Sequence, residues 1–234
     1  MLISLSSRKC VTSNINANTL TIISTMEEAK KQGSELVCFG EAFIQGFNDL
    51  TSQYDIDIKT ALTLTDTPIL SIIEKSKELS IGVAFGYIEN DHGDLYSSYL
   101  IIDSGKVIHN YRRISSGWKE TNDHRYKEAN ESLVFNFHSK KFLVALCGDL
   151  WVYPEKFKKD YDILLWPIYV SFDISKWHET ELNDYCLHSS SINDRVLLIN
   201  YIDDYSVGGS LYFKDNRIIN QIDFNIDDFI TFNI

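Results

Sequence analysis

Two side chains that could cooperate in covalent catalysis each follow a compact apolar run. Glu41 comes after the segment ELVCFG, and Cys147 comes after FLVAL. Such runs are typical of buried strands, and ligands of open α/β sheets bind beyond the carboxyl ends of strands. A thiol there can be a nucleophile, and a nearby carboxylate can remove its proton. We predict these roles for Cys147 and Glu41; the alternative is a buried structural thiol and a solvated loop acid.

Other common catalytic and ligand-binding signatures are missing from the sequence. The six histidines include no HxH or HxxxH pair and the four cysteines no CxxC pair, so we expect no metal. No glycine-rich phosphate loop is present, and we expect no cofactor. Cys10, Cys38 and Cys186 are interpreted as buried thiols in a reducing compartment.

The composition is that of an acidic globular protein. Its 234 residues carry 22 Lys and Arg against 33 Asp and Glu, a formal net charge of −11. This charge argues against a nucleic-acid partner and against an anionic membrane surface, since both attract clustered basic residues. No apolar run approaches the roughly 18 residues of a membrane helix, and the first residues show no secretory signal. We therefore expect a cytoplasmic protein.

Helices and strands must alternate to place Glu41 and Cys147 at strand ends. Helices are predicted over about residues 15–32, 68–79 and 179–194. Strands are predicted over 2–7, 35–39, 81–87, 95–103, 106–111, 142–146, 163–166, 196–201, 211–213, 217–222 and 229–232. No Pro- or Gly-rich linker divides the chain, so we expect one layered α/β domain over residues 1–234.

The first helix has clear sequence signals at both ends. Asn14 is a suitable N-cap, and Gly33 tolerates the positive φ that often follows a helix. Four apolar residues of this helix are spaced to form one stripe: Leu20, Ile23, Met26 and Ala29.

The segment around Cys147 resembles the cysteine motif of the nitrilase superfamily, the carbon–nitrogen hydrolases. The run CGDLWVYPE has the family's strand-end cysteine, a variable residue, Asp and an aromatic-Pro-Glu group. Three more segments are similar to the family in the same order: residues 18–47 with the glutamate loop, the hairpins of 86–113, and Gly-Gly-Ser at 208–210. The resemblance extends from near the start to about residue 213.

This resemblance implies a four-layer α-β-β-α sandwich of the nitrilase type, assembled as a homodimer or higher homo-oligomer. It implies a cysteine-dependent amidohydrolase that cleaves a non-peptide carbon–nitrogen bond through a thioester. The expected substrate is a small linear amide or N-carbamoyl compound, which would release ammonia. Trp118, Trp151 and Tyr169 are expected to line the substrate pocket, although aromatic residues are more often core residues.

The sequence departs from the family pattern at the position of a catalytic lysine. The family has Tyr-Arg-Lys where this chain has Tyr-Arg-Arg ending at Arg113, and Gly40 replaces the usual proline before the glutamate. Lys119 could supply the amine instead, and we place it ahead of Arg113, with Glu120 as the family's second glutamate. The alternative for Lys119 and Glu120 is a pair of solvated loop charges. A catalytically silent protein that binds a small molecule or a partner protein is the alternative function.

Overall fold

The computed structural model describes residues 1–234 as two six-stranded sheets. In spatial order, the first sheet contains β12 (Phe229–Asn233), β1 (Leu2–Ser6), β2 (Leu36–Cys38), β3 (Gly82–Asp91), β4 (Asp94–Asp103) and β5 (Lys106–Arg112). The second contains β11 (Arg217–Ile222), β10 (Ser210–Lys214), β9 (Arg195–Ile199), β8 (Ile163–Pro167), β7 (Lys140–Val144) and β6 (Phe135–Phe137).

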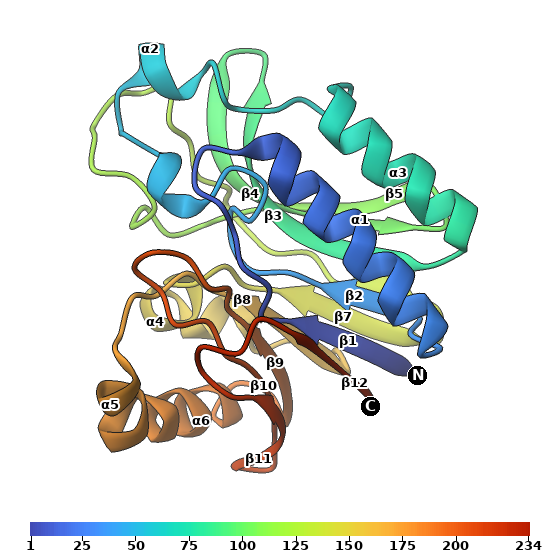
Figure 1. Ribbon diagram of the computed structural model, residues 1–234. Helices are drawn as coiled ribbons and strands as arrows, with labels where there is room; N and C mark the ends of the chain where they lie inside the picture. Colours follow the sequence, from blue (N-terminus) through green and yellow to red (C-terminus); the bar gives the residue numbers. More distant parts are fainter.

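Helices cover the outer faces of both sheets (Figure 1). The first sheet is covered by α1 (Ile15–Lys31) and α3 (Thr67–Leu79). The second is covered by α5 (Ile174–Lys176) and α6 (Leu182–Ser190), which are joined by a π-helical turn, Trp177–Glu181. The expected four-layer α-β-β-α sandwich is confirmed. None of the helices is long and apolar enough to cross a membrane.

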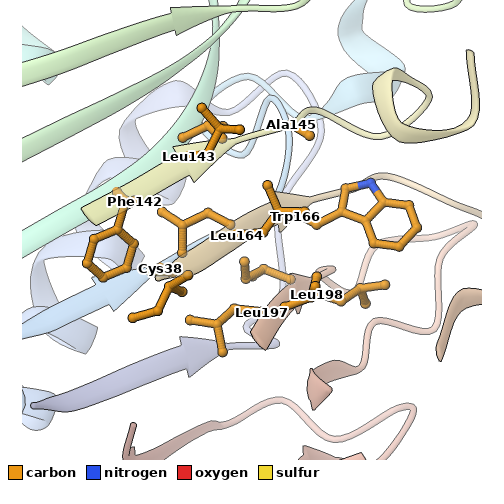
Figure 2. Close-up of a cluster of buried hydrophobic side chains, with 14 of the residues drawn as sticks. Cys38, Phe142, Leu143, Ala145, Leu164, Trp166, Leu197 and Leu198 are labelled. Atoms are coloured by element: carbon orange, nitrogen blue, oxygen red, sulfur yellow. The ribbon is translucent and has the colours of Figure 1, made fainter. Parts of the chain in front are cut away.

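The inner faces of the two sheets share one hydrophobic core. Strands β7, β8 and β9 run parallel, with Leu143 opposite Leu164 and Leu164 opposite Val196. These side chains are fully buried, as expected for parallel strands covered on both faces. Figure 2 shows Cys38 of the first sheet packed among side chains of the second, such as Leu197. This core holds the ends of β2 and β7 in fixed positions.

The first helix confirms both predicted ends and the predicted stripe at Met26 and Ala29, which are fully buried, but not at Leu20. The Asn14 side chain accepts a hydrogen bond from the Ala17 amide (3.0 Å), and Gly33 has φ +83°. Leu20, however, is 65% exposed. The buried face instead includes Thr19 and Thr25, whose hydroxyls donate to carbonyls one turn earlier in the helix. These internal bonds satisfy both hydroxyls, so two polar residues can lie on the buried face.

Five short elements and the start of one helix differ from the prediction. The short elements without a sequence prediction are β6, α2 (Tyr54–Asp57), α4 (Asp149–Val152) and the 3-10 turns Phe47–Asp49 and Pro154–Phe157. These segments have three or four residues, too few to show a periodic pattern. The helix predicted from residue 179 begins at Ile174 and passes through the π-helical turn.

Candidate active site

Cys147 lies at a strained elbow three residues beyond β7. Its φ of +41° is in the left-handed region, which is uncommon for a residue with a side chain. The Cys147 amide donates to the Pro167 carbonyl (2.9 Å), and its carbonyl accepts from the Trp166 indole nitrogen (2.9 Å). Strained backbone held by surrounding bonds is concentrated at functional sites, where it exposes a reactive side chain.

Asp149 anchors this elbow to the segment that follows β5. One carboxylate oxygen accepts from the backbone amides of Ile114 (3.1 Å) and Ser115 (2.7 Å). The other accepts from the Leu146 amide (2.9 Å) and the Tyr111 hydroxyl (2.5 Å). All four donors are buried, as is the carboxylate. Asp149 therefore fixes the cysteine elbow to Tyr111, Ile114 and Ser115, which flank Arg113.

Glu41 lies in the loop after β2 and is fully buried. Its Oε1 accepts from Arg113 Nη1 (2.8 Å) and from the Ser97 hydroxyl (2.9 Å), whereas Oε2 has no hydrogen-bond partner. The loop packs so closely on β3 that a Cβ on Gly86 would lie 2.2 Å from the Ala42 amide nitrogen. Glycine at position 86 therefore makes room for the glutamate loop. The unpartnered Oε2 is available to accept a proton.

Arg113 joins the carboxylate to the cysteine elbow. The residue is 3% exposed, and its Nε donates to the Ser115 hydroxyl (2.9 Å) while Nη1 binds Glu41. Its Nη2 faces the elbow, because a Cβ on Gly148 would lie 2.7 Å from that nitrogen. The guanidinium therefore lies between the Glu41 carboxylate and the residue that follows Cys147.

Burial and charge together keep the Cys147 thiol protonated. Burial and, to a lesser extent, the negative charge of Glu41 raise its pKa from 9.0 to about 12, against the opposing effect of the Arg113 charge. The thiol donates a hydrogen bond to the Tyr169 carbonyl (3.6 Å). A thiol with this pKa is not a nucleophile at neutral pH until a base removes its proton.

The structure places the two candidate cations in different surroundings. Lys119 Nζ donates to the Tyr126 carbonyl (2.6 Å) and pairs with Glu128 (2.6 Å). Both partners of this amine therefore lie further along the same loop. Arg113, and not Lys119, is bonded to Glu41. Glu120 is exposed, and its backbone amide donates to the Ser52 hydroxyl. Glu120 thus matches the alternative of a solvated loop charge, whereas the Lys119 side chain is only 11% exposed and is paired within its loop.

Two of the three aromatic residues expected around the pocket lie at one cavity. Trp118 is 1% exposed and helps to line a cavity of about 250 Å³ with Phe47 and Gly117. The Gly117 wall adjoins Arg113, since a Cβ there would lie 3.4 Å from Nη2. Tyr169 reaches the same region by stacking on Phe47.

Trp151 lies at the surface instead. It is 43% exposed and stacks on His188, with ring centroids 3.9 Å apart. Together with Tyr185 and Leu187 it lines a separate hollow of about 550 Å³.

Two serines complete the buried network around Glu41 and Arg113. The Ser97 hydroxyl binds Glu41, and the Ser115 hydroxyl binds Arg113. Neither serine was predicted, because a single serine has no distinctive motif. The signal that could have found Ser97 is the pairing of β4 with β3, which places it opposite Ile88 near the glutamate loop.

Comparison with known proteins finds relatives with several activities. The chain is 28% identical to a nitrilase of Meyerozyma guilliermondii over 152 residues, which cover 59% of this chain and 47% of the relative. It is 25% identical to a glutamine-dependent NAD(+) synthetase of Thermotoga maritima over 141 residues, which cover 59% of this chain and 24% of the relative. The chain thus spans about half the length of these curated relatives or less.

Solved structures support the same fold at low sequence identity. An amidase from Nesterenkonia sp. AN1 superposes with a TM-score of 0.80 and 12% identity, covering 100% of this chain and 93% of that chain. A glutamine-dependent NAD+ synthetase from Acinetobacter baumannii gives a TM-score of 0.81 and 18% identity, covering 98% of this chain and 44% of the other. The carbon-nitrogen hydrolase family profile matches residues 2–157. The chain therefore belongs to the carbon–nitrogen hydrolase family.

Proposed function

We propose that this protein is a cysteine-dependent amidohydrolase that acts on a small linear amide or N-carbamoyl compound and releases ammonia. The observation that carries the proposal is the buried Glu41–Arg113 pair beside the Cys147 elbow, with Glu41 Oε2 unpartnered. A base, a cation and a thiol are the three groups that acyl transfer through a thioester requires.

The first half of the proposed reaction forms the thioester. Glu41 takes the thiol proton, and the Cys147 sulfur attacks the substrate carbonyl carbon while the carbonyl electron pair moves to oxygen. The positive charge of Arg113 stabilises the resulting oxyanion in a site from which water is largely excluded. The tetrahedral intermediate then collapses, the carbon–nitrogen bond breaks, and the proton held by Glu41 goes to the leaving nitrogen.

The second half regenerates the thiol. Glu41 removes a proton from water, and the resulting hydroxide attacks the thioester carbon. The carbon–sulfur bond breaks, the sulfur recovers the proton from Glu41, and the acid product leaves. One carboxylate thus serves as base and acid in both halves of the reaction, as microscopic reversibility allows.

Arginine can serve in this site because its three nitrogens have separate tasks. Nη1 binds Glu41, Nε binds Ser115, and Nη2 faces Gly148. A lysine amine is a compact point charge, whereas the planar guanidinium can bond to the base and still present a donor to the elbow. The substitution therefore retains the positive charge at a fixed place.

A silent binding protein is the second candidate, favoured by the same ion pair. Arg113 occupies one of the two Glu41 oxygens at 2.8 Å, and this contact could hold the carboxylate as a structural partner only. The small cavity of about 250 Å³ beside Arg113 would then receive a ligand that is not turned over.

Ammonia release from a panel of small amides, N-carbamoyl amines and nitriles separates these proposals. We expect release from amides or N-carbamoyl compounds above the level of a Cys147→Ala control. Release from nitriles alone would overturn the amide assignment. Stoichiometric binding of an amide by the folded protein, with no release of ammonia, would favour the silent protein.

Glu41→Gln should have opposite effects on turnover and on thiol acidity. Turnover should fall roughly 10²- to 10⁴-fold because the general base is lost. The pKa of the Cys147 thiol should fall below about 12, because the carboxylate charge that raises it is removed and the Arg113 charge remains. A pH titration of thiolate absorbance, with Cys147→Ala subtracted, measures the shift. A thiolate already present at pH 7 in the wild type would contradict the general-base role.

A further inference from the structure

The Cys147 thiol is bonded to the backbone of Tyr169, whose side chain is itself fixed by hydrogen bonds. Tyr169 lies two residues beyond β8, and its carbonyl accepts from the Cys147 thiol at 3.6 Å. The Tyr169 hydroxyl donates to Asp203 Oδ1 (3.3 Å) and accepts from Asn48 Nδ2. Asn48 Nδ2 also donates to Asp203 Oδ2 (3.0 Å). These three side chains therefore bond to one another.

The Asp203 carboxylate is fixed by its own loop. Oδ1 accepts from the backbone amides of Tyr205 and Ser206, both at 2.8 Å. These two bonds to backbone amides orient the carboxylate within its own loop. The Tyr169 hydroxyl is consequently tied to the segment between β9 and β10.

The Tyr169 ring also binds the loop that carries Glu41. It stacks on Phe47, with ring centroids 5.0 Å apart and an angle of 15° between planes. The Phe47 amide donates to the Tyr201 hydroxyl (2.8 Å), and the Tyr201 ring packs against Tyr169 at 5.3 Å. Phe47 and Asn48 also line the cavity beside Arg113. The contacts of Tyr169 thus extend from the thiol to the loop that carries the base.

We propose that Asn48, Tyr169 and Asp203 form a positioning unit that sets the direction of the Cys147 thiol relative to Glu41. This inference rests on the proposed cysteine mechanism. The unit does not touch the reacting atoms through its side chains; it fixes the Tyr169 backbone, whose carbonyl then holds the thiol. Reacting groups must be held near their attack geometry, and small displacements cost large factors in rate.

The test compares Tyr169→Phe and Asp203→Ala with a matched control, Tyr205→Phe. Tyr205 is on the same loop as Asp203 and is 69% exposed, so the control loses a hydroxyl outside the unit. Tyr169→Phe keeps the aromatic stack and loses only the hydroxyl. We expect both unit variants to lower kcat by about 3- to 30-fold with KM within about twofold, because positioning and not binding is lost.

A double variant separates a unit from two independent supports. Tyr169→Phe combined with Asp203→Ala should lower kcat no further than the worse single variant, since both break the same connection. Fully additive losses, or a Tyr169→Phe kcat equal to that of Tyr205→Phe, would overturn the inference and leave the cysteine mechanism standing. Ammonia release that persists in Cys147→Ala would instead contradict the proposed function.

A readout without substrate covers the case in which no amide is turned over. The rate of Cys147 alkylation by iodoacetamide at fixed pH, followed by protein mass, reports the accessibility and protonation of the thiol. We expect this rate to differ from the wild type by at least about threefold in Tyr169→Phe and in Asp203→Ala, and to be unchanged in Tyr205→Phe. Equal rates in all four proteins would overturn the positioning role.

Discussion

Cys147→Ala is expected to abolish ammonia release, lowering it by roughly 10⁴-fold or more, because the proposed thioester forms on the Cys147 sulfur. The variant should remain folded. The elbow is held through the backbone amide and carbonyl of residue 147, which bond to Pro167 and Trp166 and do not involve the thiol. Steady-state ammonia release and thermal unfolding of the same preparation measure the two effects.

Cys186→Ala is the matched control for this variant. Cys186 is 7% exposed on α6 and packs in the core between helix and sheet, so its loss removes a small buried side chain. We expect turnover within about twofold of the wild type and a destabilisation of about 1 kcal/mol. Equal loss of turnover in both variants would attribute the effect to folding and would contradict the nucleophile assignment.

Arg113→Met is expected to damage both stability and catalysis. The change leaves the Glu41 carboxylate buried, with only the Ser97 hydroxyl as a partner. Breaking one side of a buried ion pair costs about 3–5 kcal/mol, so the free energy of unfolding should fall by that amount. Turnover should fall by about 10²-fold or more, since the oxyanion loses its cation. Denaturant unfolding and ammonia release check the two parts separately.

Lys119→Met separates this role from a general effect of charge. The Lys119 amine binds Glu128 and the Tyr126 carbonyl, at a partly exposed site. We expect a loss of about 1 kcal/mol in stability and turnover within about threefold of the wild type. Arg113→Lys should retain part of the activity because the charge is kept. If Lys119→Met abolished turnover and Arg113→Met did not, the assignment of the cation would be wrong.

The strand ends that carry Glu41 and Cys147 were predictable because their apolar runs are compact and sharply bounded. A short run of β-forming residues buried on both faces has few other structures available, and the parallel pairing of β7 with β8 confirms it. The signals at the two ends of α1, Asn14 at its start and Gly33 after its last turn, are equally local. Prediction succeeded where a few neighbouring residues determine the structure.

Prediction failed where a residue's role depends on the direction of its side chain. Lys119 is near Arg113 in sequence, and nothing in the loop sequence shows that its amine turns to Glu128. Likewise Leu20 belongs to a plausible apolar stripe, but the packing of α1 buries Thr19 instead. Contacts such as Asp203 with Tyr169 join residues 34 positions apart and leave no pattern in a single sequence.

The most direct test of the account is the mass of the protein quenched in acid during turnover of a responsive amide. We predict an added mass equal to the acyl group, located on the peptide that contains Cys147 and removed by hydroxylamine, as expected for a thioester. The Cys147→Ala protein should carry no such mass. An acyl mass on another residue, or one that persists in Cys147→Ala, would contradict the central claim that Cys147 is the nucleophile.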